Sequence, residues 1–166
     1  MNLLTSLALC ILLCIPVTSC SSGGKEGSPP WNTLTQAVDA GASNGKVILV
    51  DVYTDWCGWC KRMDRDVYAD ASVGAYLQEN FVIAKLNAES STSHTFNGTN
   101  ATEREIAKAW GVTGYPATVF LTAKGEPITV VPGYIPKETF LKVLEYIHTE
   151  SYKSVSWEDF LSSRSG

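Results

Sequence analysis

The feature that most constrains the fold is an apolar run at residues 47–53, which reads Val-Ile-Leu-Val-Asp-Val-Tyr. Asp51 is its one charged residue, and the other side chains are aliphatic or aromatic. A strand of this kind is buried on both faces, so it lies inside a sheet that helices cover on both sides. The run therefore predicts an α/β protein built around a central strand.

The remaining patterns extend this run into an alternating order of elements within one domain. The chain has 166 residues, and its 45% hydrophobic content is enough for a core. Hydrophobic periodicity predicts helices at residues 31–42, 57–79 (interrupted at 70–72), 103–110 and from Pro136 onward, and strands at residues 47–53, 81–86, 117–122 and 128–131. Helices between strands imply parallel crossovers, and a closing hairpin adds an antiparallel edge, so we expect a central mixed β-sheet flanked by helices.

Two segments are extra to this plan. Residues 88–102 are rich in Ser, Thr and Asn, and we interpret them as a polar loop insertion that forms a solvated surface loop. Near the C-terminus, Ser156-Trp-Glu-Asp159 resembles a capping box, and Trp157, Phe160 and Leu161 fall on one helical face. The pattern predicts an extra C-terminal helix that docks on the domain.

The N-terminus resembles a targeting segment. An apolar run at residues 3–17 precedes the first charged residue, Lys25, and is shorter than the roughly 20 residues that cross a membrane. Val17-Thr-Ser-Cys20 resembles the lipobox of bacterial lipoproteins, so residues 1–19 are interpreted as a signal peptide and Cys20 as the lipid anchor. The alternative is an ordinary signal peptide that leaves Cys20 as a free thiol.

Residues 20–30 are rich in Gly, Ser and Pro and indicate a flexible tether between the lipid and the domain. These features predict an extracytoplasmic protein, in the periplasm or cell envelope, that is held to a membrane through its N-terminal lipid. The net charge of −4 argues against nucleic acid as a partner, because such binders present a basic face.

The chemistry is concentrated at Cys57 and Cys60, which are three positions apart at a predicted strand-to-helix junction. The start of a helix stabilises a thiolate at Cys57, and Cys60 lies one turn further on. A thiolate attacks a disulfide, and a second thiol then releases the product from the mixed intermediate. The spacing therefore predicts thiol–disulfide exchange.

Three other uses of the pair are less consistent with the sequence. A zinc site needs two more ligands, and without the predicted signal peptide, which contains Cys10 and Cys14, the chain offers only Cys20, His94, His148 and carboxylates, with no second C-x-x-C. Haem attachment needs a histidine where Lys61 stands, and a structural disulfide gains little from so short a loop. We therefore expect no metal and no cofactor besides a redox-active disulfide. Because no nucleotide or flavin motif is present, electrons must come from a partner.

Residues 50–61, Val-Asp-Val-Tyr-Thr-Asp-Trp-Cys-Gly-Trp-Cys-Lys, resemble the active-site stretch of the thioredoxin superfamily. They are most similar to periplasmic thioredoxin-like domains, including the C-terminal domain of the transmembrane disulfide reductase. Lys85-Leu-Asn87, the cis-proline-like loop at residues 111–118 and Gly133 also match. The resemblance covers about residues 31–149 and implies a thioredoxin fold. With the extra C-terminal helix, we expect a thioredoxin-like domain at residues 31–166. Trp59 stands where thioredoxin has proline, which leaves the redox potential open.

The resemblance also implies roles for individual residues. Cys57 would be the nucleophile, Cys60 the resolving thiol, and Asp51 a buried acid, near Lys85, that helps to move the proton of Cys60. Substrate binding would fall to Trp56, Gly58, Trp59, Tyr115 and Pro116, with Pro116 in the cis form. From the residues alone, Asp51 can instead face water at an edge, Lys85 can be an exposed lysine, Pro116 can be an ordinary trans turn proline, and both tryptophans can belong to the core.

The expected function is reduction of disulfides in extracytoplasmic proteins, with electrons supplied by an upstream redox partner. Lys61 is the cation nearest to the pair, so we expect a moderately lowered pKa for Cys57 and a potential at the reducing end of the superfamily. Alternatives are a disulfide oxidant or isomerase, a non-catalytic peptide-binding module, and a metal-delivery role at the cysteine pair.

Overall fold

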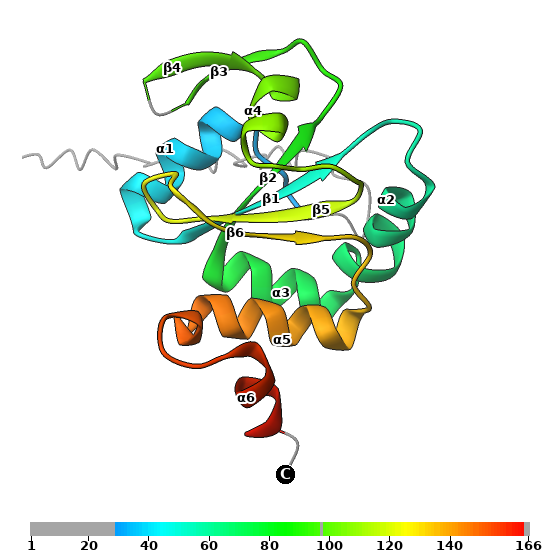
Figure 1. Ribbon diagram of the computed structural model, residues 1–166, viewed down its shortest axis with the longest axis vertical. Coiled ribbons are helices and arrows are strands. Elements are labelled where there is room, and N and C mark those ends of the chain that lie inside the picture. The colour runs from blue at the N-terminus through cyan, green and yellow to red at the C-terminus, as the bar shows by residue number, and fades with distance from the viewer. Residues whose placement is uncertain (1–28, 97, 165–166) are drawn as a thin grey trace, which may run out of the picture.

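The computed structural model describes residues 29–96 and 98–164, which form a sheet between two helical layers (Figure 1). The sheet has the order β2-β1-β5-β6. Its strands are β1 (Val47–Tyr53), β2 (Phe81–Asn87), β5 (Ala117–Leu121) and β6 (Pro127–Pro132). Helices α1 (Leu34–Asn44) and α4 (Glu103–Ala109) cover one face, and α3 (Ala71–Asn80) and α5 (Lys137–His148) cover the other. The predicted thioredoxin-type architecture, with a central mixed sheet, is confirmed.

The direction of β5 differs from the expectation of parallel crossovers. Strand β1 pairs parallel with β2, but β5 runs antiparallel to β1 and β6 antiparallel to β5. The prediction was wrong for the crossover through α4 because that helix has only seven residues and rises about 10 Å, whereas β2 extends about 23 Å. This helix alone does not carry the chain back to the start of β2, and β5 instead runs antiparallel to β1 from the end at which β2 finishes.

Alternation along β1 divides the core and positions one carboxylate. Ile48, Val50 and Val52 pack with α1 and α4, whereas Leu49 packs with α3 and α5 on the opposite face. Asp51 shares the face of Leu49, and in the sheet it is the register partner of Lys85 on β2. Strand β1 therefore places Asp51 on the face of the sheet that α3 and α5 cover.

The helix after β1 has three parts. Helix α2 (Gly58–Met63) continues into a π-helical turn, η1 (Asp64–Tyr68), and α3 begins afresh where the carboxylate of Asp70 accepts the backbone N–H groups of Ser72 and Val73. The predicted interruption is present, but it lies at Ala69 and Asp70 instead of residues 70–72, and the π turn was not predicted. The turn ends with Tyr68 buried beneath the sheet.

The polar stretch at residues 88–102 is more ordered than expected. Strands β3 (Ser93–Phe96) and β4 (Thr99–Thr102) form an antiparallel hairpin, so the prediction of a plain surface loop was wrong. His94 on β3 is only 7% exposed, and its ring contacts Thr35 on α1 and Glu103 at the start of α4. Because the buried side of this hairpin is polar, apolar periodicity does not reveal it.

The C-terminal extension docks as predicted. A 3₁₀ turn, η2 (Ser151–Lys153), leads into α6 (Trp157–Ser162), and the hydroxyl of Ser156 caps this helix by accepting the N–H of Asp159. Tyr146 on α5 has its ring centroid 5.3 Å from that of Trp157 and 4.9 Å from that of Phe160. These aromatic contacts hold α6 against α5, on the side away from the sheet (Figure 1).

The segment before α1 closes one edge of the sheet. The N–H of Asn32 donates to the carbonyl of Ile83 at 3.0 Å, and its carbonyl accepts the N–H of Lys85 at 3.2 Å. The predicted signal peptide, Cys20 and the tether up to residue 28 lie outside the described residues. Within residues 29–96 and 98–164, no helix has the length and apolarity needed to span a membrane.

Candidate active site

The two cysteines of the C-x-x-C motif form a disulfide at the start of α2. Cys57 is the N-cap of this helix, and its Sγ accepts the N–H of Cys60 at 3.0 Å. The N–H of Cys57 itself donates to the carbonyl of Thr54 at 3.1 Å, which holds the turn between β1 and α2. Cys57 is 4% exposed and Cys60 is similarly buried. A backbone N–H directed at Cys57 Sγ is the kind of donor that stabilises a thiolate there when the pair is reduced.

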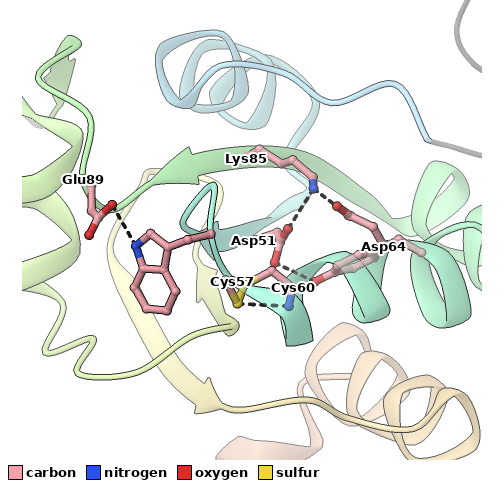
Figure 2. Close-up of a disulfide and its surroundings, with 8 residues drawn as sticks. Asp51, Cys57, Cys60, Asp64, Lys85 and Glu89 are labelled. Carbon is pink, nitrogen blue, oxygen red and sulfur yellow. Dashed lines mark hydrogen bonds and ion pairs between the residues drawn. A yellow bond between two sulfur atoms is a disulfide. The ribbon is translucent and has the colours of Figure 1, made fainter.

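A buried acid lies beneath this pair. Asp51 is 1% exposed, which confirms its predicted burial and excludes an edge position facing water. Its Oδ2 is 3.2 Å from Nζ of Lys85, which also contacts the carboxylate of Asp64, and the hydroxyl of Tyr68 donates to its Oδ1 at 3.5 Å. In Figure 2 the carboxyl group of Asp51 lies between the ammonium group of Lys85 and the cysteines.

Burial controls the titration of this acid. Loss of solvent raises the pKa of Asp51 from 3.8 to about 6, against the attraction of Lys85, and the charge of Asp64 raises it further. Burial opposes the charge of Lys85, but Asp51 and Asp64 outweigh this effect and raise the pKa of its ammonium group. Asp51 therefore takes up and releases a proton close to neutral pH, while Lys85 stays charged.

A cis peptide bond joins Tyr115 to Pro116, as the resemblance implied. Pro116 is buried and directly precedes β5, whose residue Ala117 is the register partner of Val52 on β1. The carbonyl of Pro116 accepts the N–H of Gly133 at 2.8 Å, and Gly133 has a φ of +83°, a backbone conformation that favours glycine. The proline loop is thus tied to the end of β6 and lies at the end of β1 from which the Cys57 turn departs.

Trp56 and Trp59 belong to the surface and not to the core, with exposed fractions of 67% and 54%. The indole N–H of Trp56 donates to Oε2 of Glu89 at 3.0 Å (Figure 2), and its ring stands edge-on to that of Tyr115 at a centroid distance of 6.1 Å. This tryptophan is held on one side by a residue of the insertion and on the other by the residue before the cis-proline.

Trp59 is held by different contacts. Its ring centroid lies 5.5 Å from that of Tyr134, and the guanidinium of Arg62 lies 5.1 Å from the Trp59 centroid and 5.3 Å from that of Tyr134. Gly58, between Cys57 and Trp59, is exposed, and a Cβ placed there would meet no atom within 4 Å. The disulfide is therefore adjacent in sequence to two exposed aromatic rings and an open glycine.

Some residues that shape the site were not singled out from the sequence. Asp64 lies one helical turn after Cys60, a spacing that would have pointed to it, but Tyr68 reaches Asp51 only through the unpredicted π turn. Glu89 lies in the stretch interpreted as a surface loop. Among the described residues, no group of three or more His, Cys, Asp or Glu side chains is placed to hold a metal ion.

A disulfide at a helix start, a buried acid beneath it and a cis-proline at the start of the strand paired with β1 together define a redox-type thioredoxin-fold domain. Comparison with known proteins agrees: the profile of the thioredoxin-like domain family matches residues 34–148. The chain belongs to this family.

The similar proteins include larger ones. A thiol:disulfide interchange protein DsbD of Ralstonia nicotianae is 35% identical over 113 residues, which cover 67% of this chain. A protein disulfide-isomerase of Hordeum vulgare is 28% identical over 104 residues, or 63% of this chain. The chain spans 17% of the length of each of these two relatives.

Solved structures show the same likeness. A thioredoxin-fold protein from Helicobacter pylori superposes with a TM-score of 0.62 at 25% identity, over 73% of this chain and 80% of that one. A thioredoxin from Thermus thermophilus gives 0.59 at 26% identity, over 72% and 87% of the two chains.

Proposed function

We propose that the protein is a thiol–disulfide oxidoreductase whose Cys57 and Cys60 reduce disulfides of extracytoplasmic proteins. The observation that carries the proposal is the Cys57–Cys60 disulfide at the start of α2, with Asp51 buried beneath it. Relatives whose names describe disulfide interchange and disulfide isomerisation support the same chemistry.

The exchange proceeds in two displacements. The thiolate of Cys57 attacks one sulfur of a substrate disulfide, forming a mixed disulfide and expelling the other sulfur as a thiolate. The thiolate of Cys60 then attacks Sγ of Cys57, which closes the Cys57–Cys60 disulfide and releases the second substrate thiolate. Two electrons pass from the dithiol to the substrate, and the N–H of Cys60 stabilises the negative charge on Cys57 before the first attack.

Asp51 is proposed as the group that handles the proton of Cys60. To attack, Cys60 must lose its proton, and a carboxylate with a pKa of about 6 accepts one near neutral pH and returns it to a leaving thiolate. Burial raises this pKa, Lys85 and Tyr68 partly offset that effect, and both hold the carboxylate in position.

The substrate is proposed to lie as an extended segment across the exposed surface around the disulfide. Trp56 and Trp59 supply apolar contact area, and Gly58 leaves room for the close approach of the substrate sulfur. Tyr115 and Pro116 form the loop whose backbone would pair with the substrate chain. The position of this loop at the end of β1 supports the assignment.

A direct test separates the two cysteine roles. A Cys60→Ser variant should accumulate mixed disulfides through Cys57, because the second displacement is blocked. A Cys57→Ser variant is the control and should trap none. Trapping by the Cys57→Ser protein alone would reverse the assignment of nucleophile and resolving thiol.

The direction of electron flow is proposed as reduction, as the resemblance of residues 50–61 to the transmembrane disulfide reductase implies, and the relatives named as thiol:disulfide interchange proteins are compatible with it. The similarity to protein disulfide-isomerases favours isomerisation as a second candidate. Equilibration of the isolated protein with glutathione measures its reduction potential and separates a reductase from an isomerase. The reduction potential is about −270 mV for thioredoxin and about −180 mV for protein disulfide isomerase. We expect a value closer to that of thioredoxin, and one at or above that of the isomerase would refute the reductase assignment.

A role without catalysis is tested by activity. A peptide-binding module or a metal-delivery protein would bind its ligand without consuming thiols, whereas an oxidoreductase reduces insulin in the presence of a thiol donor. Because each turnover oxidises the dithiol, the enzyme also requires an upstream electron-donating partner.

The proposed location rests on the sequence of residues 1–30. We propose that residues 1–19 are removed, that Cys20 receives lipid, and that residues 20–30 tether the domain to an extracytoplasmic membrane face. Mass spectrometry of the mature N-terminus tests this proposal. A free Cys20 thiol or a retained Met1 would exclude the anchor.

A further inference from the structure

We propose that the β3–β4 hairpin positions Trp56 for substrate binding, with Glu103 as the positioning residue that links them. The inference rests on the proposed function, because it assigns Trp56 to the substrate surface. It concerns the insertion at residues 88–102, which has no part in the proposed exchange between the cysteines and the substrate. A chain of hydrogen bonds runs from the hairpin to the exposed indole.

The series of hydrogen bonds begins with the buried ring of His94. The ring of His94 on β3 lies between two partners, with Nδ1 3.1 Å from the hydroxyl of Thr35 and Nε2 3.0 Å from Oε1 of Glu103. The other carboxylate oxygen of Glu103 accepts the backbone N–H of Asn87, the last residue of β2, at 3.1 Å. Both oxygens of this carboxylate are therefore engaged, one by the hairpin and one by the sheet.

The series of hydrogen bonds continues from Asn87 to the indole of Trp56. Oδ1 of Asn87 accepts the N–H of Glu89 at 3.0 Å, and its Nδ2 donates to Asp55 at 3.2 Å, in the turn that carries Trp56. Oε2 of Glu89 then accepts the indole N–H of Trp56 at 3.0 Å, the contact drawn in Figure 2. Two of these hydrogen bonds join segments that are distant in sequence, and the bond between Asn87 and Glu89 holds the local backbone turn. Together they fix the position of the surface around Trp56.

The backbone around Glu89 is also held by the insertion. The N–H of Glu103 donates to the carbonyl of Thr92 at 2.9 Å, just before β3. Arg104, the next residue on α4, donates its N–H to the carbonyl of Ser90 at 3.3 Å and a guanidinium N–H to the carbonyl of Glu89 at 2.6 Å. The segment that carries Glu89 is therefore anchored to the start of α4, where the hairpin also ends.

These links matter because Trp56 is two-thirds exposed. An exposed ring rotates among several orientations unless specific contacts select one, and a ring already held in its binding pose loses less entropy when a substrate arrives. Removing the Glu103 carboxylate leaves the N–H of Asn87 and the ring of His94 without their acceptor. The expected consequence is weaker substrate binding with unchanged sulfur chemistry.

The experiment compares Glu103→Ala with two matched variants. Glu103→Gln keeps an acceptor for Asn87, and its amide can donate to His94 because the hydroxyl of Thr35 can serve as donor or acceptor on the other side of the ring. Glu105→Ala removes the capping-box carboxylate of the same helix, which bonds Thr102 and does not contact Asn87. It therefore controls for a general loosening of α4.

The readout is single-turnover exchange of the reduced protein with a fluorogenic peptide disulfide and with a small disulfide reagent. For Glu103→Ala we expect the half-saturating peptide concentration to rise about five- to tenfold, with the limiting rate and the reaction with the small reagent unchanged. Glu103→Gln and Glu105→Ala should stay within about twofold of the unsubstituted protein. An unchanged half-saturating concentration in Glu103→Ala, or an equal rise in Glu105→Ala, would overturn the inference.

A second readout does not depend on activity. The indole N–H resonance of Trp56, assigned by its loss in Trp56→Phe, should shift in Glu103→Ala as it does in Glu89→Ala, and the peptide effects of these two substitutions should not add when combined. If Glu103→Ala does not fold, Asn87→Ala cuts the same chain further along and should give the same changes. If the unsubstituted protein exchanges with neither disulfide, the proposed function fails, and the indole resonance alone decides whether the hairpin positions Trp56.

Discussion

Replacing Asp51 with asparagine should stabilise the oxidised protein by about 3 kcal/mol at about pH 7 and by less than about 1 kcal/mol at about pH 4. The side chain is 1% exposed, so solvent does little to screen its charge. Asparagine has nearly the same shape as the protonated acid but never carries the charge. The variant therefore isolates what the buried charge does to folding.

The magnitude follows from the titration of Asp51. Burial raises the pKa from 3.8 to about 6, so the folded protein binds this proton more tightly than the unfolded chain does. The stability that protonation supplies is complete below the unfolded pKa and is lost as the pH rises from about 4 to about 6. A gap of about 2 pH units between the two pKa values, at about 1.4 kcal/mol each, gives about 3 kcal/mol.

Urea unfolding of the oxidised protein at both pH values measures the effect by linear extrapolation. Asp64→Asn is the control, because it removes the other carboxylate on Lys85 from a side chain that is 44% exposed. We expect that variant to change stability by less than about 1 kcal/mol at either pH. A gain in Asp51→Asn that is the same at both pH values, or a loss at neutral pH, would refute the argument from burial.

Three further predictions follow from the geometry. If Asp51 accepts the proton of Cys60, the release of substrate from a mixed disulfide should slow as the pH falls through about 6, as rapid-quench kinetics would show, and in Asp51→Asn this dependence should vanish. Phe160→Ala should lower the free energy of unfolding by about 3 kcal/mol, because this ring is buried against Tyr146, while the exchange rate should stay unchanged; a slower exchange would mean that α6 reaches the site. Trp59→Ala should weaken binding of a peptide disulfide with a stability change below about 1 kcal/mol, since the ring is half exposed, and equal affinity in a binding titration would remove it from the substrate surface.

The central part of the fold was predictable because buried strands consist of nearly continuous apolar residues, which are visible in the sequence. The run at residues 47–53 predicted the central strand, and the structure confirms it. The burial of Asp51 and the cis form of Pro116 also matched the expectations. The catalytic roles of these residues remain predictions.

What escaped prediction depended on geometry that local patterns do not encode. The direction of β5 depends on how far a seven-residue helix can carry the chain, and periodicity gives no direction. Residues 88–102 looked like a loop because their hairpin buries His94 against polar partners. The dipeptide Asn97-Gly98, which is typical of tight hairpin turns, was the signal that could have revealed it.

The two outer strands of the sheet show how the protein avoids pairing with the wrong chain. Asn32 already occupies the free side of β2, and β6 begins with Pro127 and ends with Pro132, neither of which has an N–H to offer. An unprotected sheet edge can pair with any extended segment that it meets. Both borders of the sheet are therefore poorly suited to accept a further strand, whether from another protein or from a second copy of this chain.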